Sequence, residues 1–429
     1  MKKKNNKSKK ANEIKIWNKY IDKVSIKEPQ MDVVTDPDKI DEALTRGVKD
    51  IFPKQKDLKK LLLSGKRIKL YTGIDPTANF LHVGHFIWMR KLAQFQKLGH
   101  QVIFLIGGFT AMIGDPDKQY TREPLTKQQV WNNFKDYKST ASKILNFDWK
   151  DNPITILNNY DWLSKVTLED WLQIMGKITL QNILSHDMFR TRLKEEKPIR
   201  LHETMYPLMQ GFDSTVMQVD LEVGGSDQTF NMLTGRTLSR ELTNKNKFVL
   251  TLKLLTDTKG EKMGKTTGNA ISSLDAPEDM YGKIMSWTDE KLLESFELLT
   301  NIDLNTVKKG IKSGKQMLLK KQLAFEIVKM LNDEEISRKA QEHFEKTVQK
   351  GETPDEMKEI KCKKELTALE LVKELVKKGI IASNAEAKRL IKQGGIEIEG
   401  KKVKDFEQKI KLEKGNVVKV GKRKFVRIK

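Results

Sequence analysis

The sequence predicts an α/β protein whose main domain is built on a doubly wound parallel sheet, and three observations carry this prediction. From about residue 67, apolar runs of strand length alternate with helix-spaced patterns. Several of these runs end in polar, glycine-containing turns, where such sheets bind ligands. Beyond residue 277 the pattern becomes helical and charged, and a basic unit with short strands follows. We therefore expect a Rossmann-like domain, then a helical domain and a small α+β domain.

Two strands of the sheet are predicted by "RIKLYTGID" and "QVIFLIGGF", with a helix over residues 84–98 between them. The second run is apolar almost throughout, as a strand covered on both faces requires. One face of the helix is expected to carry Phe86, Ile87, Leu92 and Phe95. "ITILNN" and "VMQVDLEVGG" predict further strands. The turns "GIDP", "GDPDK" and "GGSDQ" then fall at the carboxyl ends of strands.

The domain boundaries follow from changes in composition. The later pattern includes a polar linker and a helix that opens with Ser383 and Glu386 in capping-box spacing. The predicted parts are a basic, flexible N-terminal arm over 1–30, the Rossmann-like domain over 31–276, the helical domain over 277–348, the linker over 349–365 and the α+β domain over 366–429.

The net charge of +22 lies mostly at the two ends of the chain. Residues 1–30 hold ten Lys or Arg and three Asp or Glu, and residues 366–429 hold eighteen and eight. Two basic ends favour a polyanionic partner, most simply nucleic acid, although a basic end can also be only a solvated arm. The single cysteine, Cys362, excludes an internal disulfide, and no apolar run approaches the roughly 20 residues of a membrane span. We expect a cytoplasmic protein without membrane association.

The tetrapeptide "HVGH" places His82 and His85 around Gly84 at a predicted helix start, in a chain with six histidines. A helix N-terminus suits phosphates because it carries unpaired N–H groups and partial positive charge. Gly84 lets a flat ring approach the backbone, and imidazole N–H groups can donate to a phosphate that gains charge. Taken alone, the tetrapeptide fits two ordinary helix-start histidines equally well.

Such a phosphate site needs further cations, and "GEKMGKTTGN" supplies Lys262 and Lys265 on a glycine-rich loop. In a lysine-rich chain this pair alone is weak support. The order HVGH, then GGSDQ, then KMGKT is much less expected by chance.

That combination carries a resemblance. "HVGH" resembles the HIGH signature and "KMGKT" the KMSKS signature of class I aminoacyl-tRNA synthetases. "YTGIDPTANFLHVGH", "YPLMQGFD" and "GGSDQTFNML" resemble bacterial-type tyrosyl-tRNA synthetase, over most of residues 45–300. The unit from about residue 366 resembles the S-four RNA-binding domain that bacterial tyrosyl enzymes append. The resemblance implies a tyrosine–tRNA ligase that uses ATP with Mg²⁺, has no protein-built metal site, binds tRNA and forms a homodimer.

The resemblance also implies a role for each matching residue. Tyr71 and Asp213 would hold the phenolic hydroxyl of tyrosine. The rest of the tyrosine site would be Tyr206, Gln210 and Asp115 around the α-ammonium group, with Asp75 and Gln228 lining the pocket. ATP would be bound by Gly73, Thr77, His82, Gly84, His85, Gly225, Asp227, Lys262, Met263 and Lys265. The catalytic set would be His82, His85, Lys262, Lys265 and Thr266.

The spacing within "YPLMQGFD" supports the tyrosine site independently. Tyr206, Gln210 and Asp213 stand at i, i+4 and i+7, so they share one helix face. An acceptor at each end of a pocket suits an amino acid with an ammonium group and a phenol. Capping and packing by polar residues would explain the stretch without a ligand.

Two further assignments concern phosphates. The resemblance assigns Lys118 and Arg122 to pyrophosphate. Their loop, "GDPDKQYTR", is one residue shorter than the family's usual loop and lacks its glycine. Lys388, Arg389 and Lys392 share a predicted helix whose Ala387, Leu390 and Ile391 are expected to be buried. We expect this basic face to bind tRNA phosphates, a solvated face being the alternative.

The sequence thus predicts a ligase that joins tyrosine to its tRNA through tyrosyl-adenylate. The alternatives are a tryptophanyl or other class I synthetase, an inactive RNA-binding relative, and a nucleotidyltransferase acting on a small alcohol. The tyrosine-pocket residues and the appended domain count against the first, and the intact motifs against the second. The third leaves the basic C-terminal unit unexplained.

Overall fold

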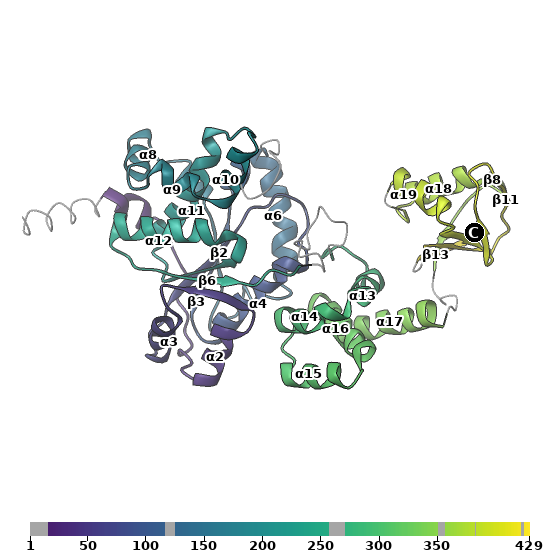
Figure 1. The fold of residues 1–429 in the computed structure, drawn as a ribbon, viewed down its shortest axis with the longest axis horizontal. Coiled ribbons are helices and arrows are strands. Elements are labelled where there is room, and N and C mark those ends of the chain that lie inside the picture. The colour runs from purple at the N-terminus through teal and green to yellow at the C-terminus, as the bar shows by residue number, and fades with distance from the viewer. Residues whose placement is uncertain (1–15, 116–124, 257–270, 351–356, 382, 422–423) are drawn as a thin grey trace, which may run out of the picture. The chain divides into compact units, whose positions relative to one another are not determined.

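The structure is a computed structural model that describes residues 16–115, 125–256, 271–350, 357–381, 383–421 and 424–429. The chain divides into two compact units (Figure 1). One unit is Met1–Leu274 with Thr288–Gln316, and the other is Asp275–Trp287 with Met317–Lys429.

The first unit is built on a six-stranded sheet with the order β1-β6-β5-β2-β3-β4. Its strands are β1 (Val48–Phe52), β2 (Lys69–Ile74), β3 (Gln101–Ile106), β4 (Thr155–Asn158), β5 (Leu221–Gly225) and β6 (Phe248–Leu252). β1 is antiparallel to β6, and the other pairs are parallel. From β2 the chain adds β3 and β4 on one side, and β5 and β6 lie on the other, so the order reverses between β2 and β5. The predicted doubly wound parallel sheet is confirmed, and the reversal marks where such sheets bind ligands.

Helices cover both faces of this sheet, α4 on one face and α11 and α12 on the other (Figure 1). The helices of the unit are α2 (Pro37–Thr45), α3 (Gln55–Leu63), α4 (Val83–Lys97), α5 (Thr110–Ile113), α6 (Lys127–Ala141), α7 (Tyr160–Leu163), α8 (Leu168–Met175), α9 (Leu180–Leu184), α10 (Asp187–Lys194), α11 (Leu201–Met217), α12 (Thr229–Thr243), α14 (Leu292–Leu299) and α15 (Leu304–Lys312), with 3₁₀ turns η1 (Ser226–Gln228) and η3 (Asp289–Lys291). The predicted apolar face of α4 is buried, and every residue of β3 is buried.

α11 and α12 cross closely because each has a glycine at the crossing. A Cβ on Gly211 would lie 2.9 Å from the Cα of Gly235 and 2.7 Å from Leu238 Cδ1. Any larger side chain at either position would push the helices apart. The close crossing holds the polar face of α11, with Tyr206, Gln210 and Asp213, near the strand ends.

The predicted flexible arm over residues 1–30 is wrong for its second half. Residues 16–21 are helical, and Trp17 and Tyr20 are buried against Phe212 with edge-on ring contacts at 5.6 and 5.5 Å. Tyr20 Oη also donates to Asp170 at 2.5 Å. Two large rings in this segment remove enough apolar surface from water to fix it. Residues 1–15 lie outside the described ranges.

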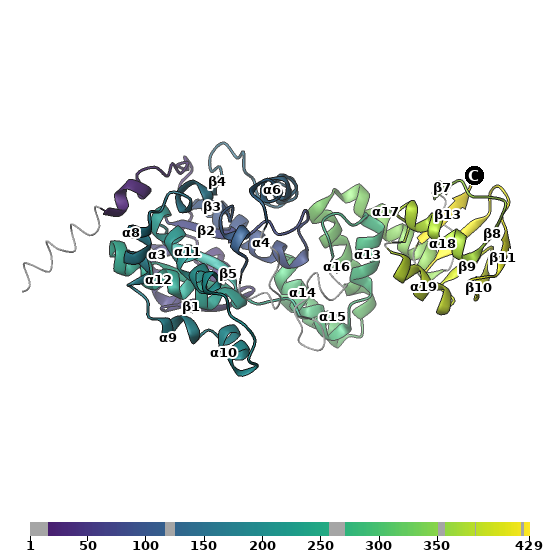
Figure 2. The ribbon, with the colours of Figure 1, turned by 90° about the horizontal axis from the view of Figure 1, so that it is seen from above.

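The second unit contains helices and a small α+β part. Its helices are α13 (Pro277–Met285), α16 (Gln316–Leu331), α17 (Glu334–Phe344), the π-helical turn η4 (Glu345–Gln349), α18 (Ala368–Lys377) and α19 (Asn384–Lys392). Its strands are β7 (Lys358–Ile360), β8 (Glu365–Thr367), β9 (Ile396–Ile398), β10 (Lys401–Val403), β11 (Lys409–Lys411), β12 (Val417–Val420) and β13 (Lys424–Ile428). They form one sheet with the order β10-β9-β12-β13-β7 and a pair β11-β8 (Figure 2).

This division differs from the predicted boundaries in two places. The predicted helical domain is split, because α14 and α15 belong to the first unit and α13, α16 and α17 to the second. The predicted linker over 349–365 contains β7, which pairs in parallel with β13, so the α+β part begins before residue 366. No helix in the described ranges is long and apolar enough to cross a bilayer.

Candidate active site

The predicted site residues of the first unit gather where β2, β3 and β5 end. Tyr71 on β2 lies opposite Glu222 on β5 in the parallel register. Asp75 follows β2 directly, and its carboxylate accepts hydrogen bonds from Tyr206 Oη at 2.9 Å and from Thr110 Oγ1 at 2.7 Å. The turn after β2 and the polar face of α11 therefore meet at the reversal point of the sheet.

Two glycines that follow β3 leave space for polar side chains of the site. A Cβ on Gly107 would lie 1.8 Å from Asp75 Oδ1, and one on Gly108 would lie 2.1 Å from Asn158 Oδ1. The "GG" after the second strand thus allows two polar side chains to approach the backbone. Gly73 is exposed at the end of β2, and the Thr77 N–H donates to the Asp75 carbonyl at 2.8 Å.

Tyr71 is buried, and its hydroxyl contacts Glu222 Oε1 at 2.6 Å and Ser214 Oγ at 2.8 Å. Burial, and then the charges of Glu222 and Asp213, raise the pKa of Tyr71 well above its usual range, so the hydroxyl keeps its proton. Gln210 Nε2 donates to the same Glu222 oxygen at 3.0 Å. Glu222 thus joins Tyr71 and Gln210, which the sequence assigns to opposite ends of tyrosine.

Asp213 does not hydrogen-bond Tyr71. Its carboxylate accepts from Asn159 Nδ2 at 3.0 Å and from Trp162 Nε1 at 2.7 Å. Burial raises the pKa of Asp213 to about 8, and these two donors oppose the rise. A buried carboxyl held in place by two donors can still accept a further hydrogen bond from a phenol.

Further predicted residues lie after β3 and at the end of β5. Gln228 Nε2 donates to Asp115 Oδ2 at 2.9 Å, so the structure brings together the turns after β3 and β5. A Cβ on Gly225 would lie 2.4 Å from Asp227 Oδ1, which explains a glycine there.

His82 and His85 occupy the N-cap and third position of α4, with ring centroids 3.8 Å apart. His82 Nδ1 accepts from the Gly84 N–H at 3.2 Å, and His85 Nδ1 accepts from the His82 N–H at 3.0 Å. In neutral imidazole the accepting nitrogen carries no proton, so each ring carries its N–H at Nε2. Both histidines can therefore donate at the positive end of a helix.

Residues that follow the predicted KMGKT loop lie beside HVGH. Val83 N donates to Ile271 O at 3.0 Å, and Ser273 N donates to Leu81 O at 2.8 Å. The predicted residues Lys118, Arg122, Lys262, Met263, Lys265 and Thr266 lie outside the described residues.

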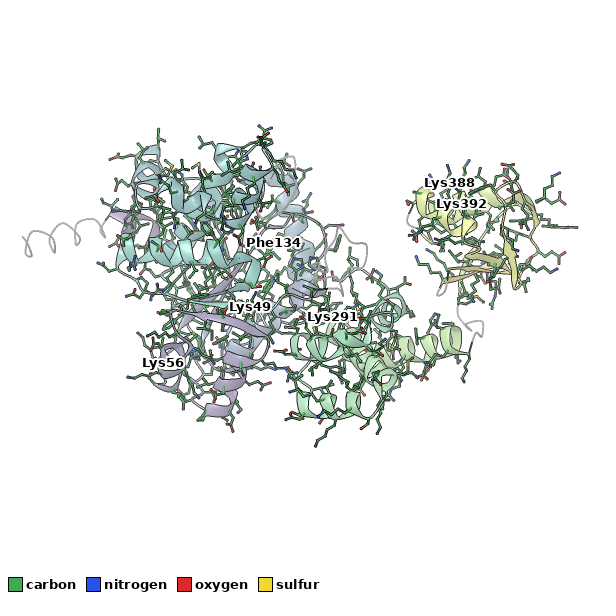
Figure 3. The ribbon with its side chains drawn as sticks, in the orientation of Figure 1. Lys49, Lys56, Phe134, Lys291, Lys388 and Lys392 are labelled. Atoms are coloured by element: carbon green, nitrogen blue, oxygen red, sulfur yellow. The ribbon has the colours of Figure 1, made fainter. Side chains whose placement is uncertain are left out.

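In the second unit, Lys388, Arg389 and Lys392 are exposed on α19, and Figure 3 labels the first and last of them. Ala387 and Ile391 are buried as predicted, whereas Leu390 is only half-buried. The helix therefore presents a basic face to solvent.

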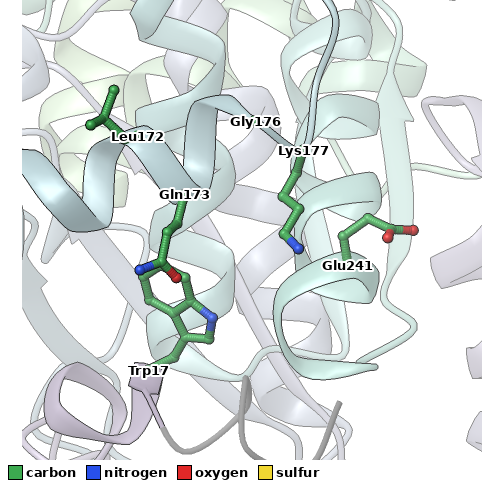
Figure 4. Close-up of a pocket in the computed structure, with 6 residues that line it drawn as sticks. All are labelled: Trp17, Leu172, Gln173, Gly176, Lys177 and Glu241. Atoms are coloured by element: carbon green, nitrogen blue, oxygen red, sulfur yellow. The ribbon is translucent and has the colours of Figure 1, made fainter. Parts of the chain in front are cut away.

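None of the predicted site residues lines a cavity of about 260 Å³ in the first unit (Figure 4). Its lining residues are Trp17, Leu172, Gln173, Gly176, Lys177 and Glu241. Within the described ranges, no cluster of three or more His, Cys, Asp or Glu side chains is placed to hold a metal ion.

Two family models match the chain. The model "tRNA synthetases class I (W and Y)" matches residues 63–349, and the model "Tyrosine--tRNA ligase SYY-like C-terminal domain" matches residues 349–428. The chain belongs to the tyrosine–tRNA ligase family of class I tRNA synthetases. The second match begins before residue 366, in agreement with the position of β7.

Individual relatives are similar over nearly their full length. The tyrosine–tRNA ligase of Moorella thermoacetica is 39% identical over 395 residues, covering 90% of this chain and 94% of that protein. The one from Thermotoga maritima is 40% identical over 393 residues, covering 90% and 96%. A C-terminally truncated mitochondrial tyrosyl-tRNA synthetase of Coccidioides posadasii superposes with a TM-score of 0.60 at 22% identity, over 79% of this chain and 99% of that one. At that identity the likeness concerns the fold alone.

Sequence reasoning missed the partners of the family's motif residues. Asn159 and Trp162 hold Asp213, and Ser214, Glu222 and Lys247 surround Tyr71. Glu222 stands in an apolar strand run, "LEVGG", and a charge there is a usable sign of a buried partner. Nothing in the local sequence distinguishes Lys247 from the chain's many surface lysines.

Proposed function

We propose that the chain activates L-tyrosine with ATP and then transfers the tyrosyl group to the 3′ end of tRNA. In the first step a tyrosine carboxylate oxygen attacks the α-phosphorus of ATP, and the bond to the β-phosphate oxygen breaks to release pyrophosphate. In the second step a hydroxyl of the terminal ribose attacks the tyrosyl carbonyl, and AMP leaves. Family membership supports this reaction, and the meeting of β2, β5 and α11 at the reversal point of the sheet supports the assignment of residues.

The first step needs no general base, because a carboxylate is already a nucleophile. Catalysis then rests on positioning and on stabilising phosphate charge. His82 and His85 would donate through Nε2 to the phosphates of ATP, which would enter with Mg²⁺ as substrate. Lys262, Lys265 and Thr266 would join them, and the pairing of residues 271–273 beside HVGH supports this. Lys118 and Arg122 remain proposals for pyrophosphate.

Tyrosine would lie between α11 and the ends of β2 and β5. Tyr71 and Asp213 are assigned to the phenol, and Tyr206, Gln210 and Asp115 to the ammonium group. Asp75 and Gln228 would orient those groups, because they hydrogen-bond Tyr206 and Asp115 respectively. The ribose would face Gly225 and Asp227.

Exposed leucines on the first unit favour association of this chain with a second copy of itself. Leu168 and Leu172 lie four residues apart on α8 and are 75% and 60% exposed, and Leu180 and Leu201 at the starts of α9 and α11 are 59% and 79% exposed. Both α8 and α9 pack against α11, so these exposed leucines stand on neighbouring helices, and exposed apolar side chains favour a protein partner. We expect analytical ultracentrifugation to show a dimer. The double variant Leu168→Asp with Leu172→Asp should dissociate it, and Leu318→Asp on α16 should not.

The proposed cytoplasmic location stays a prediction.

Exchange of labelled pyrophosphate into ATP tests the function, run with each of the twenty amino acids. We expect exchange with tyrosine alone, followed by charging of tRNA. Exchange with tryptophan would support the tryptophanyl alternative, and no exchange with any amino acid would support an inactive RNA-binding relative.

A further inference from the structure

Four side chains beside the tyrosine site form a buried hydrogen-bonded cluster. Tyr71, Ser214, Glu222 and Lys247 are each no more than 2% exposed, and we call them the Glu222 cluster. Ser214 comes from α11, Glu222 from β5, and Lys247 directly precedes β6. Only Tyr71 in this cluster has a role assigned by sequence motifs.

The Glu222 carboxylate holds both ends of the tyrosine site. Oε1 accepts from Tyr71 Oη at 2.6 Å and from Gln210 Nε2 at 3.0 Å. Oε2 accepts from the Lys247 ammonium group and lies 3.4 Å from Ser214 Oγ. One carboxylate thus fixes a residue assigned to the phenol and another assigned to the ammonium group of tyrosine.

The donors and acceptors fix the direction of each hydrogen bond. Lysine can only donate, so Ser214 Oγ accepts from Lys247 Nζ at 2.5 Å. An ionised carboxylate can only accept, so the Tyr71 hydroxyl donates to Glu222. Ser214 then has its own proton for Tyr71 Oη at 2.8 Å. A ligand phenol has one proton to donate, and Asp213 is the acceptor assigned to it, so Tyr71 can contact the phenolic oxygen only through its own hydroxyl, which Glu222 and Ser214 hold in place.

We propose that Glu222 and Lys247 are positioning residues for tyrosine recognition, and that this buried pair holds Tyr71 and Gln210 in the orientation that binds the substrate. The proposal rests on the proposed function and adds residues that no motif assigns. Phenylalanine has no hydroxyl, so in this pocket it leaves Asp213 and the oriented Tyr71 hydroxyl facing a group that cannot form a hydrogen bond. Lys247 thereby contributes to the choice between tyrosine and phenylalanine without touching either.

The chain makes room for this charge pair at a cost in stability. A Cβ on Gly235 would lie 2.7 Å from Lys247 Nζ, so glycine at that point of α12 leaves space for the ammonium group. Burying two charges is expensive, and a well-packed neutral pair is often as stable. A pair kept only for stability could therefore be replaced by neutral residues without loss of substrate recognition.

A matched control pair joins the same two segments. Lys245 Nζ donates to Asp220 Oδ1 at 2.7 Å, and each of these residues stands two positions before its counterpart in the Glu222 cluster. The Lys245 and Asp220 side chains are 26% and 17% exposed, against 0% and 3% for Lys247 and Glu222. Their hydrogen bonds reach none of the residues assigned to tyrosine.

The experiment compares Glu222→Gln with Lys247→Met, as a double variant and singly, against Asp220→Asn with Lys245→Met. Pyrophosphate exchange gives KM for tyrosine, KM for ATP and the tyrosine-to-phenylalanine ratio of kcat/KM. For the Glu222–Lys247 double variant we expect KM for tyrosine to rise about tenfold or more, the ratio to fall by about tenfold, and KM for ATP to change by less than about twofold. The control pair should leave all three values unchanged.

The double variant separates positioning from stability, because it leaves no unpaired buried charge even if the single variants fail to fold. A merely structural pair would alter the amount of active protein and hence the apparent kcat, but not KM for tyrosine. Wild-type KM and wild-type preference in the double variant, or equal effects of the control pair, overturn the proposal. If the wild-type protein shows no tyrosine-dependent exchange, the proposed function itself fails.

Discussion

At the scale of single residues, the backbone hydrogen bonds of His82 and His85 determine which ring nitrogen carries the proton. Each ring accepts a backbone N–H at Nδ1, so each carries its own proton at Nε2. The capping arrangement therefore places an N–H donor on Nε2 of each ring at the N-terminus of α4, where the proposed phosphate charge would develop.

Removing either ring should slow activation more than it weakens tyrosine binding. His82→Ala and His85→Ala are each expected to cost roughly 2–4 kcal/mol in adenylate formation, by analogy with loss of one oxyanion-hole donor. Single-turnover adenylate formation and the equilibrium Kd for tyrosine measure the two effects separately. His343→Ala on α17 is the control, and unchanged adenylate formation in both site variants would contradict the assignment.

We expect Asp213 to be essential for the activation of tyrosine. Asp213→Ala removes the acceptor for the phenol and leaves Asn159 Nδ2 and Trp162 Nε1 without their partner, so we expect a loss of roughly 100-fold or more in kcat/KM for tyrosine. Asp161→Ala, which removes an exposed carboxylate beside Trp162, should have little effect. Normal activation of tyrosine by Asp213→Ala would place the pocket elsewhere.

At the scale of residues, the sequence predicted the site side chains that belong to motifs. It did not predict the side chains that hydrogen-bond to them. Tyr206, Gln210 and Asp213 could be grouped because helical spacing puts them on one face. Lys247 could not, because its role depends on Glu222 and Ser214, which are 25 and 33 residues away in the sequence.

At the scale of elements, hydrophobic spacing predicted the strands and α4 well, because burial of one face is a local pattern. β3 could be recognised from its unbroken apolar run. The assignment of β7 to the terminal sheet could not, since it depends on pairing with β13 almost 70 residues later. The same holds for α14, whose place in the first unit depends on contacts with α4.

The junction between α4 and β3 carries a histidine that should make the fold acid-sensitive. His100 is fully buried, and neither ring nitrogen has a hydrogen-bond partner among the described residues. Burial, with a smaller effect of Arg67, lowers the pKa of His100 to about 4 from 6.5. In the folded state the ring stays neutral while the unfolded chain takes up a proton.

The stability that depends on neutral His100 is therefore complete above pH 6.5 and is lost as pH falls towards 4, by about 3 kcal/mol. His100→Leu should flatten this part of the pH dependence, measured by denaturant unfolding at pH 7.5 and 4.5. His202→Leu, at an exposed position of α11, should not. Equal acid sensitivity of the wild type and His100→Leu would contradict the expectation.

At the scale of the whole molecule, the described residues assigned to activation and the basic face proposed to bind tRNA belong to different units. All described residues assigned to tyrosine and ATP belong to the first unit, and the basic face of α19 belongs to the second. The site residues that the structure describes thus require nothing from the α+β part. The charge distribution predicts a polyanionic partner for the C-terminal end, and the resemblance predicts that this partner is RNA; where the α+β part begins depends on the pairing of β7 with β13.

Truncation after Lys350 should therefore spare tyrosine-dependent pyrophosphate exchange and impair charging of tRNA. The cut has to fall before β7, because removal from residue 365 would leave a strand whose partner β13 is gone. Exchange and charging assays on the same preparation measure the two activities. A truncated protein that charges tRNA as well as the full chain would assign the α+β part to another task.

Neutralising basic residues of α19 within the full chain tests directly whether this helix binds tRNA phosphates. Replacing Lys388, Arg389 and Lys392 by Gln removes three exposed cations from α19, so fewer counterions are released on binding and the slope of log K against log salt should become shallower by roughly 2 to 3. Replacing Lys409, Lys411 and Lys414 by Gln removes the same charge from other exposed positions of the α+β part. If the α19 face contacts phosphates, the first variant flattens the slope and raises Kd for tRNA much more than the second. Equal effects of the two variants would mean that net charge, rather than this face of the helix, attracts the RNA.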